Sequence, residues 1–513
     1  MSGATPDILS NSAPSAETAA PQIGRFWLAE EPETWQAEAE ALGLAAAHLA
    51  ACGADDARAE AARLAELGLL MLAAPGPGQE PGQKPEQGAP QNSQQRFDPR
   101  LPVFQQAALA AGAISAPCPF CGKPVASSES YPVFINAFDQ PVFYRFACCD
   151  EFFLIAAKSP QAKLALWLPH RQLVVSFVEY RRFPHNHDYY GPAQFAEWLK
   201  LYARLVAANA GLVAAYRAGQ TPRRTALALG FVFNFGHHVS DELSALPFVP
   251  ALTAGRAPLA VLGPFDFFDA GGVFAAELGP DPARVEAQGA ATPPELFRLA
   301  LEQNLFVTRL SHTAPLQEAV AQRLLDAAGE RCTPEFLHRA RQSARCRPLA
   351  WVTLRSHNRA WRGQAQGLAQ VLNSLRREYP DLGVVFDGLE AERPLLAEAL
   401  ALLEPGLPAY DGLGTSLFEA LAWAGQADFF IAPFGNGTGF TSIANIPGVV
   451  HTHEEWAKAE PFCINRRENC ALALPVVGRT LHEPGRDSYS SDYELDWREV
   501  LHAARLVLAE IKP

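Results

Sequence analysis

The stretch ADFFIAPFGNGTGFTSIANIP, residues 427–447, says most about the fold of this chain. It begins with a short apolar run, 428–434, and turn residues follow at once, which is typical of a buried parallel strand. Gly435, Gly437 and Gly439 then allow the backbone to turn sharply and to lie close to a ligand, because no side chain stands in the way. The stretch therefore predicts a strand that runs into a glycine-rich loop.

A short helix is expected directly after this loop. Thr438, Thr441 and Ser442 offer hydroxyl groups and N-caps at its start, and Pro447 closes it. A strand, a glycine loop and a helix N-terminus together suit phosphate or sugar oxygens, since free N–H groups and the helix dipole point at the ligand. An ordinary glycine-rich turn is the other interpretation, and this segment alone leaves both open.

The composition narrows the class of protein. A chain of 513 residues is too long for one core, and its 49% hydrophobic and 19% charged residues suit a globular protein of several domains. The net charge of −13 argues against nucleic-acid binding, which needs positive charge. No apolar run is long enough for a membrane span and no secretory signal is visible, so we expect a cytoplasmic protein whose cysteines are thiols or metal ligands.

The pattern along the chain predicts a modular organisation. An alanine- and leucine-rich stretch has helical spacing with a break before Asp55, which would cap a second helix; this pair of helices would serve either a protein partner or a structural cap. The expected regions are a disordered 1–24, a helical hairpin 25–74, a flexible linker 75–100, a β-rich cysteine (zinc-ribbon-like) module with helices 101–222, and two Rossmann-like halves, 223–345 and 346–513.

Short apolar runs alternate with helical patterns from residue 225 onward, and this alternation predicts an α/β fold with open parallel sheets. In one of the helical patterns, Leu368, Val371, Leu372, Leu375 and Tyr379 form a single apolar stripe. Aromatic and branched runs between turn residues predict a β-rich segment further upstream. The expected strands are 133–135, 142–146, 152–155, 164–168, 227–233, 259–262, 306–310, 349–354, 383–386 and 428–434.

A first candidate for chemistry, residues 234–244, follows directly after an expected strand. On a helix, His237 and Asp241 share a face, and so do His238 and Glu242. An imidazole beside a carboxylate could act as a general base on a sugar hydroxyl, with the carboxylate orienting it. Two incidental histidines at a helix N-terminus, or a metal held by both pairs, are the alternatives.

A second candidate, residues 351–362, is a strand that runs into a loop and a helix. Arg355, Arg359 and Arg362 lie where a doubly wound sheet binds ligands, at the carboxyl end of a strand, and Asn358 lies between them. Guanidinium groups suit a diphosphate, because they form bidentate charge-assisted hydrogen bonds. Solvated surface arginines are the other interpretation.

Two further clusters contain cysteine and histidine. Cys118 and Cys121 form a Cys-x-x-Cys-Gly knuckle, and Cys148 and Cys149 follow after a β-rich interval, which resembles a zinc ribbon. The second pair is adjacent, and neighbours on a strand point to opposite faces, so thiols packed without metal remain the alternative to a structural zinc ion. The histidine-rich run 451–456 is expected to be a surface loop.

Together these segments resemble the GT-B glycosyltransferases, and specifically the family of plant xylan arabinosyl- and xylosyltransferases, the EGF-domain O-GlcNAc transferase and bacterial capsule enzymes. That family carries Asn-Tyr-x-His-Trp-x-x-Asp-x-Leu-Pro in its first half and His-Gly-Ala-Gly-Leu-Thr-Asn in its second. The resemblance covers about residues 225–450. The first motif is matched by Asn234, Phe235, His237, Asp241 and Leu243, while His238 replaces its Trp and Ser244 its Pro. The second motif is matched in spacing by residues 437–442, while Asn436 replaces its His and Ser442 its Asn.

The resemblance implies transfer of a hexosyl or pentosyl group from a nucleotide-sugar donor to a hydroxyl of a glycan or other acceptor, with inversion, as in polysaccharide assembly. His237 or Asp241 would deprotonate the acceptor. The donor would lie between two facing Rossmann-like domains, and no catalytic cofactor would be needed, because the diphosphate would be stabilised by protein groups. A degenerate, transferase-like scaffold that only binds carbohydrate or nucleotide is the alternative. The implied donor-binding residues are Arg355, Asn358, Arg359, Gly435, Asn436, Gly437, Thr438, Gly439, Thr441 and Ser442.

Overall fold

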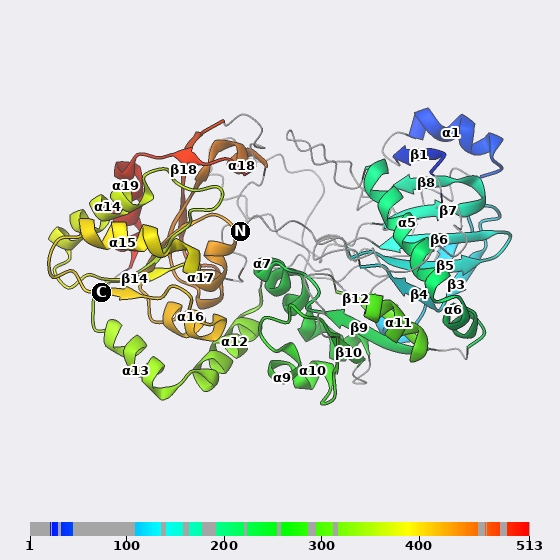
Figure 1. The fold of residues 1–513 in the computed structure, drawn as a ribbon, viewed down its shortest axis with the longest axis horizontal. Helices are drawn as coiled ribbons and strands as arrows, with labels where there is room; N and C mark the ends of the chain where they lie inside the picture. The colour runs from blue at the N-terminus through cyan, green and yellow to red at the C-terminus, as the bar shows by residue number, and fades with distance from the viewer. Residues whose placement is uncertain are drawn as a thin grey trace, which may run out of the picture.

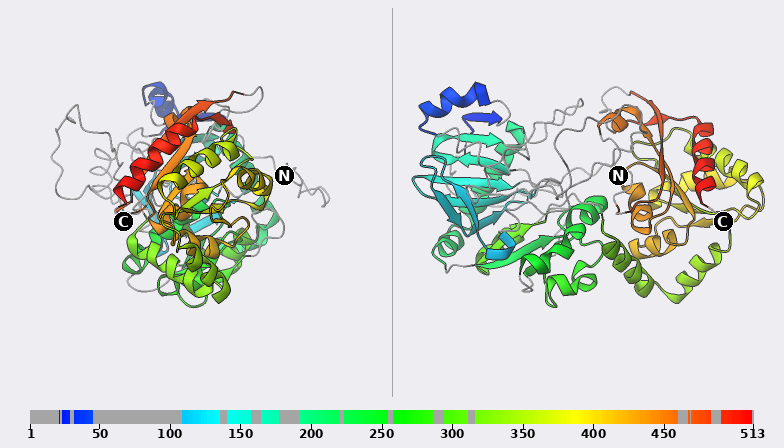
Figure 2. Two further views of the ribbon diagram at one scale, coloured as in Figure 1. Left: turned by 90° about the vertical axis from the view of Figure 1, so that its left-hand side faces the viewer. Right: turned by 180° about the vertical axis from the view of Figure 1, so that it is seen from behind.

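The computed structural model describes residues 21, 23–28, 32–44, 108–134, 140–156, 164–176, 191–219, 223–253, 258–285, 294–310, 316–459, 467, 469–482 and 490–511. Most of the N-terminal segment expected to be disordered, the second helix of the hairpin and the linker 75–100 lie outside these residues. Three sheets with their helices follow one another along the long axis of the molecule (Figures 1 and 2). None of the described helices combines the length and the apolar character that crossing a membrane requires.

The C-terminal sheet has the strand order β15-β14-β13-β16-β17-β18-β19, and all neighbours are parallel except β18 and β19. Taken in chain order, its first six strands therefore run 3-2-1-4-5-6, which is the order of a doubly wound nucleotide-binding sheet. The strands are β13 (Leu349–Thr353), β14 (Gly383–Asp387), β15 (Ala409–Asp411), β16 (Phe429–Pro433), β17 (Gly448–His453), β18 (Ala473–Thr480) and β19 (Tyr493–Glu494).

Helices cover both faces of this sheet. Successive side chains of each strand point to opposite faces, so the apolar strands have hydrophobic residues to bury on both. Val352 and Ile431 face α14, α15 and α19, whereas Trp351 and Phe430 face α13 and α16. The predicted apolar stripe is confirmed on α14, where all its members except the half-buried Tyr379 are buried. The helices are α13 (Pro334–Ser343), α14 (Gln364–Glu378), α15 (Arg393–Leu402), α16 (Leu417–Ala424), α17 (Gly439–Ala444), α18 (Glu454–Ala459) and α19 (Trp497–Glu510).

The middle sheet is also parallel, with the order β11-β10-β9-β12. Its order 3-2-1-4 reverses between β9 and β12, so this half is Rossmann-like as predicted. The elements are β9 (Arg224–Leu229), α7 (Phe235–His237), α8 (Val249–Leu252), β10 (Leu259–Leu262), α9 (Ala270–Val273), α10 (Ala275–Leu278), β11 (Ala283–Arg284), α11 (Pro294–Glu302), β12 (Leu305–Arg309) and α12 (Glu318–Arg331). α13, which precedes the domain boundary expected at 345, packs on the C-terminal sheet.

The N-terminal sheet has the order β1-β8-β7-β6-β5-β4 and is antiparallel except for the β1–β8 pair. Its aromatic side chains pack under α5 on one face and under the β2–β3 ribbon on the other. The elements are β1 (Arg25–Leu28), α1 (Pro32–Ala41), β2 (Ile114–Pro117), β3 (Pro124–Ser127), β4 (Glu129–Pro132), β5 (Val142–Ala147), β6 (Glu151–Ala156), β7 (Leu164–Leu168), β8 (Leu173–Ser176), α5 (Pro192–Ala208) and α6 (Ala210–Arg217).

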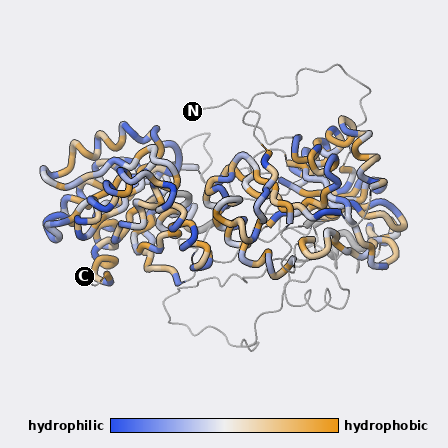
Figure 3. The backbone as a smooth tube through the Cα atoms, turned by 90° about the horizontal axis from the view of Figure 1, so that it is seen from below, coloured by the Kyte–Doolittle hydropathy of each residue, from blue (hydrophilic) through white to orange (hydrophobic). Residues whose placement is uncertain are grey.

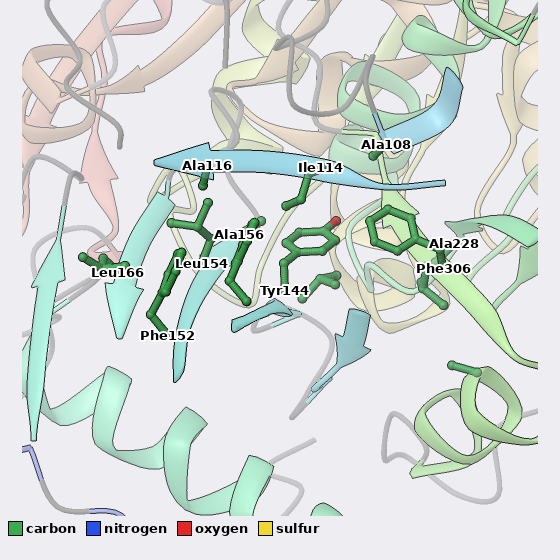
Figure 4. Packing of buried hydrophobic residues seen from close by; sticks show 14 of the residues in the cluster. Ala108, Ile114, Ala116, Tyr144, Phe152, Leu154, Ala156, Leu166, Ala228 and Phe306 are labelled. Atoms are coloured by element: carbon green, nitrogen blue, oxygen red, sulfur yellow. The ribbon is translucent and has the colours of Figure 1, made fainter. Parts of the chain in front are cut away.

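Two features of this N-terminal region differ from the prediction. Residues 25–28, expected within a helical hairpin, form strand β1, because their aromatic side chains complete the edge of the sheet beside β8. The sheet also shares one apolar core with the middle half. In that core Tyr144 and Ile114 pack with Phe306 and Ala228 (Figure 4). Along the tube of Figure 3, hydrophobic and hydrophilic residues alternate in all three parts, as expected of layers that bury one face each.

Candidate functional site

The site lies where the strand order of the C-terminal sheet reverses, between β13 and β16. These two strands are parallel neighbours, so their carboxyl ends reach the same edge and the segments after them leave in opposite directions. A crevice at this point is where open α/β sheets bind ligands. The segment after β13 carries Arg355, and the segment after β16 begins with the glycine loop at Gly435, as the sequence predicts.

Two guanidinium groups converge on this loop. A Cβ atom placed on Gly435 would lie 3.8 Å from Nη2 of Arg355 and 3.8 Å from Nη1 of Arg359. Gly435 has a φ of 112°, which favours glycine. Arg355 is only 7% exposed and donates from Nη1 to the carbonyl oxygen of Phe434 at 3.2 Å. Arg355 is therefore buried at the edge where the sequence predicts it, and Arg359 is half-buried beside it.

The charge of Arg355 is not neutralised by the protein: among the described residues it forms no ion pair within 4.0 Å. The neighbouring carboxylate of Glu392 is already engaged, since it accepts hydrogen bonds from Ser356 and from His357. Burial and the nearby charge of Arg359 lower the pKa of Arg355 to about 10, so the group is still cationic at neutral pH. Such a buried, uncompensated cation is costly unless an anion binds beside it.

Other groups shape the arginine loop. Arg359 has a left-handed backbone, with a φ of 48°, and its guanidinium lies 4.3 Å from the centre of the Trp456 ring. Asn358 has a buried Oδ1 atom that no described group hydrogen-bonds. Arg362 is exposed, one turn beyond the crevice. The geometry thus separates the predicted trio, because Arg355 and Arg359 share the loop and Arg362 does not.

The glycine loop forms the opposite wall. Thr438 donates its hydroxyl to the carbonyl of Gly435 at 2.8 Å, and Thr441 donates to the carbonyl of Thr438 at 3.0 Å. Both threonines are buried, so their hydroxyls fix the shape of the loop and do not cap α17 as the sequence suggested. Ser442 is partly exposed on α17, and the side chain of Asn436 is outside the described atoms.

The first predicted motif has the geometry of a base and its orienting carboxylate. Asn234 caps the turn by accepting the backbone N–H of His237 at 3.2 Å. Nδ1 of His237 lies 2.8 Å from Oδ2 of Asp241, whose other oxygen accepts from Ser240 at 2.8 Å. His237 keeps 35% of its side chain exposed, whereas Asp241 keeps 5%. An ionised Asp241 places the proton on Nδ1 and leaves Nε2 of His237 as the basic atom.

The neighbouring pair, His238 and Glu242, is structural. Both side chains are buried, with Nδ1 of His238 2.8 Å from Glu242, and Glu242 also accepts from the backbone of Gly230 and from Arg309. Burial opposes the charge of His238, but Glu242 and Asp266 outweigh it and raise the pKa of His238 to about 9. The two pairs therefore have different surroundings, and among the described residues they do not bring three metal-ligating atoms together.

The two motifs meet across the boundary between the halves. The rings of Phe235 and Phe440 lie 4.9 Å apart, and a Cβ on Gly439 would lie 2.1 Å from Cε1 of Phe235. Phe235 also shares a core with Leu421 and Ile443 of the C-terminal half. Phe235, two residues before His237, thus packs on the start of α17, which brings the backbone of the imidazole motif beside the glycine loop.

The structure corrects the prediction for residues 451–456. His451 and His453 belong to the buried strand β17 and not to a surface loop, because the strand that begins at Gly448 continues through both histidines. Nδ1 of His451 lies 2.6 Å from the hydroxyl of Tyr493, while no described group hydrogen-bonds its Nε2. Burial and the charge of Arg355 lower the pKa of His451 to about 3, so this ring is neutral beside the arginine. Sequence reasoning missed this contribution to the site.

The four cysteines lie together, far along the chain from the crevice. Their sulfur atoms all lie within 4.8 Å of one another, with Cys121 to Cys148 at 3.8 Å and Cys148 to Cys149 at 4.0 Å. A tetrahedral Zn–S site has sulfur edges of about 3.8 Å. Cys148 and Cys149 occupy the turn after β5 and not a strand, so the expected strain does not arise. The backbone of Lys123 helps to lower the pKa of Cys121 to about 7. This cluster can hold a metal ion.

The structure thus combines two parallel α/β sheets with an antiparallel sheet. Two arginines and a glycine loop lie at the topological switch point of the C-terminal half, and a histidine–aspartate pair belongs to the middle half. No family model and no curated protein matches the chain. Three of the solved structures that are similar to parts of it, at low identity and low TM-score, are a glycosyl transferase, a heptosyltransferase and POFUT1.

The first is the family 9 glycosyltransferase from Veillonella parvula DSM 2008, with 12% identity, a TM-score of 0.38, and coverage of 56% of this chain and 98% of that chain. The second is E. coli ADP-heptose LPS heptosyltransferase II, with 12% identity, a TM-score of 0.36, and coverage of 56% of this chain and 99% of that chain. The third is POFUT1 in complex with GDP, with 13% identity, a TM-score of 0.28, and coverage of 50% of this chain and 99% of that chain.

Proposed function

We propose that this protein is a glycosyltransferase that uses a nucleotide-sugar donor. The observation that carries the proposal is the buried guanidinium of Arg355, which has no ion-pair partner among the described residues and points with Arg359 at the glycine loop of a doubly wound sheet. A nucleoside diphosphate supplies negative charge beside the buried cation of Arg355, through bidentate charge-assisted hydrogen bonds. Asn358, Gly437 and Ser442 are the nearby groups proposed to complete the donor site.

In the proposed reaction His237 acts as the base. Nε2 takes the proton of the acceptor hydroxyl while the oxygen bonds to the anomeric carbon, and the bond from that carbon to the diphosphate breaks with its electron pair leaving on the diphosphate. Asp241 keeps the imidazole in the required tautomer and stabilises the imidazolium that forms. Arg355 and Arg359 stabilise the departing charge, so the displacement needs no further cation. One displacement inverts the anomeric centre.

The cysteine cluster is proposed to bind one structural zinc ion, because four thiolates with tetrahedral spacing suit Zn²⁺. Cys118 follows β2 and Cys121 precedes β3, while the other two ligands belong to the turn after β5. The ion would therefore pin the β2–β3 ribbon to the N-terminal sheet. It would supply stability and take no part in the transfer. A cytoplasmic location and a role in glycan assembly complete the proposal.

The proposal is tested by incubating the protein with UDP-, GDP-, ADP- and dTDP-sugars and measuring the nucleoside diphosphate released. His237→Ala is expected to lower this release by a factor of about 10²–10⁴, the usual contribution of a general base, while nucleotide binding is retained. His502→Ala, an exposed histidine on α19, is the matched control and should behave like the wild type.

Two results would contradict the proposal. Full turnover by His237→Ala would remove this residue from the role of base. Folded wild-type protein that binds a nucleoside diphosphate but releases none from any donor would instead support the carbohydrate- or nucleotide-binding scaffold without catalysis.

A further inference from the structure

A row of aromatic side chains borders the carboxyl edge of the middle sheet. Phe233 follows β9, and Phe265 and Phe267 follow the neighbouring strand β10. The rings of Phe233 and Phe265 lie 5.0 Å apart and nearly perpendicular, at 68°, and the rings of Phe265 and Phe267 lie 6.3 Å apart. Phe233 is 59% exposed, which is unusual for a phenylalanine that lies among other aromatic rings.

The row is held rigidly in place. The backbone N–H of Phe265 donates to the carbonyl of Gly230 at 2.7 Å, and that of Gly263 donates to Leu229 at 2.8 Å, so the two loops are tied to each other. The backbone N–H of Gly230 is in turn bound by the buried carboxylate of Glu242 at 2.8 Å. An exposed ring on a fixed loop loses little conformational entropy when a ligand covers it.

The row ends beside His238, the neighbour of the proposed base in the sequence. Phe267 lies 5.8 Å from the ring of His238 and 6.3 Å from that of Phe235, which packs against the glycine loop of the other half. Phe233 directly precedes Asn234, the residue that caps the turn of His237. Apolar ring faces and a hydroxyl-directed base are therefore presented by the same short loop.

On the basis of the proposed transfer, we infer that Phe233 and Phe265 form the platform on which a sugar ring of the acceptor stacks, so that the acceptor is a glycan. A sugar ring has an apolar face of C–H groups and a rim of hydroxyls. The aromatic rings would pack against the apolar face of the sugar, and Nε2 of His237 would accept a hydrogen bond from one of the hydroxyls. A protein partner would need an interface of about 1,000 Å² or more, which a row of three phenyl rings does not supply.

The test uses methyl β-D-glucopyranoside, methyl β-D-galactopyranoside, methyl α-D-mannopyranoside and methyl β-D-xylopyranoside as probes. Saturation-transfer NMR on the full chain should show transfer to the ring C–H protons of at least one of them. Phe233→Ala should weaken the binding of that glycoside by about tenfold, because one stacked ring is lost. Phe233→Trp should retain this binding. Leu506 is an exposed apolar residue on α19, and the control Leu506→Ala should leave the affinity unchanged.

Nucleoside-diphosphate binding to the same variants separates this inference from the proposed function. Glycoside binding that depends on Phe233 without any nucleotide binding would preserve the platform and overturn the transfer. Nucleotide binding without any glycoside binding, or with binding indifferent to Phe233→Ala, would overturn the platform alone. A change in oligomeric state caused by Phe233→Ala, measured by light scattering, would assign the row to self-association and overturn the platform as well.

Discussion

Two buried charged side chains of this protein differ in whether a described residue of opposite charge forms an ion pair with them. Glu242 has several partners, since it accepts from Gly230 and Arg309 and pairs with His238. Arg355 is buried to a similar degree and has only neutral hydrogen-bond partners among the described residues. A fully paired network is what a structural role requires, whereas an unneutralised cation at a ligand-binding edge is what an anion site requires.

The paired network leads to a prediction about pH. The pKa of His238 is raised from 6.5 to about 9 in the folded protein, so the folded state binds this proton more tightly than the unfolded state does. The stability that this proton contributes is present in full below the unfolded pKa and is lost as the pH rises through about 9. We expect wild-type stability in urea to decline between neutral pH and pH ~10 by an amount of order 3 kcal/mol or less. His238→Gln should show a much smaller decline, and an equal decline in both proteins would show that this proton does not contribute.

At the scale of elements, the proposed metal ion would act on the β2–β3 ribbon. The ribbon has two short strands and covers the core residues Tyr144 and Leu154 of the N-terminal sheet. A two-stranded ribbon is marginally stable alone, so the proposed metal ion would help to hold it on the sheet.

Removal of the metal is therefore expected to destabilise this region. Closing the loop between Cys121 and Cys148 contributes about 3 kcal/mol by analogy with a covalent cross-link, which corresponds to a fall of about 6–12 °C in the melting temperature. We expect about one zinc ion per chain by elemental analysis, and a lower melting temperature after chelation or in Cys121→Ser. Cys470→Ser, outside the cluster, is the control. Metal-free protein with an unchanged melting temperature would refute the role.

Local sequence signals predicted several elements well. The strand before the glycine loop and the strand 259–262 were found because each is a short apolar run beside turn residues. β17 was not predicted, because its apolar start is short and histidine is polar, and only the surrounding tertiary structure, including Tyr493, shows that these rings can be buried. β1 was missed because its partner β8 is remote in sequence, so nothing local identifies it as a strand.

The candidate site was partly predictable for the same reason. The pairing of His237 with Asp241 follows from helical spacing, and the position of Arg355 follows from its place after a strand. The packing of Phe235 on Gly439 could not be predicted, since it joins residues about two hundred positions apart through tertiary contacts alone. The hydroxyls of Thr438 and Thr441 were assigned to the ligand, although they bond within their own loop.

At the scale of the whole molecule, the three sheets form a continuous body in which the middle half contacts both of its neighbours (Figure 1). The N-terminal sheet completes the core of the middle half, and the middle half places the histidine motif against the glycine loop of the C-terminal half. In the proposed transfer, the two Rossmann-like sheets would provide separate surfaces for the donor and the acceptor.

The most direct test of the central claim is a calorimetric titration of UDP, GDP, ADP and dTDP into wild-type protein and Arg355→Met, with Arg341→Met on α13 as the exposed control. We predict that the wild type and the control bind one of these nucleotides, and that Arg355→Met binds it about 10–100-fold more weakly, because a charge-assisted hydrogen bond is lost. Ligand-free Arg355→Met should also melt at a higher temperature, since it no longer buries an uncompensated charge. Equal affinity in Arg355→Met and the wild type, or no binding of any nucleotide by the folded wild-type protein, would contradict the account.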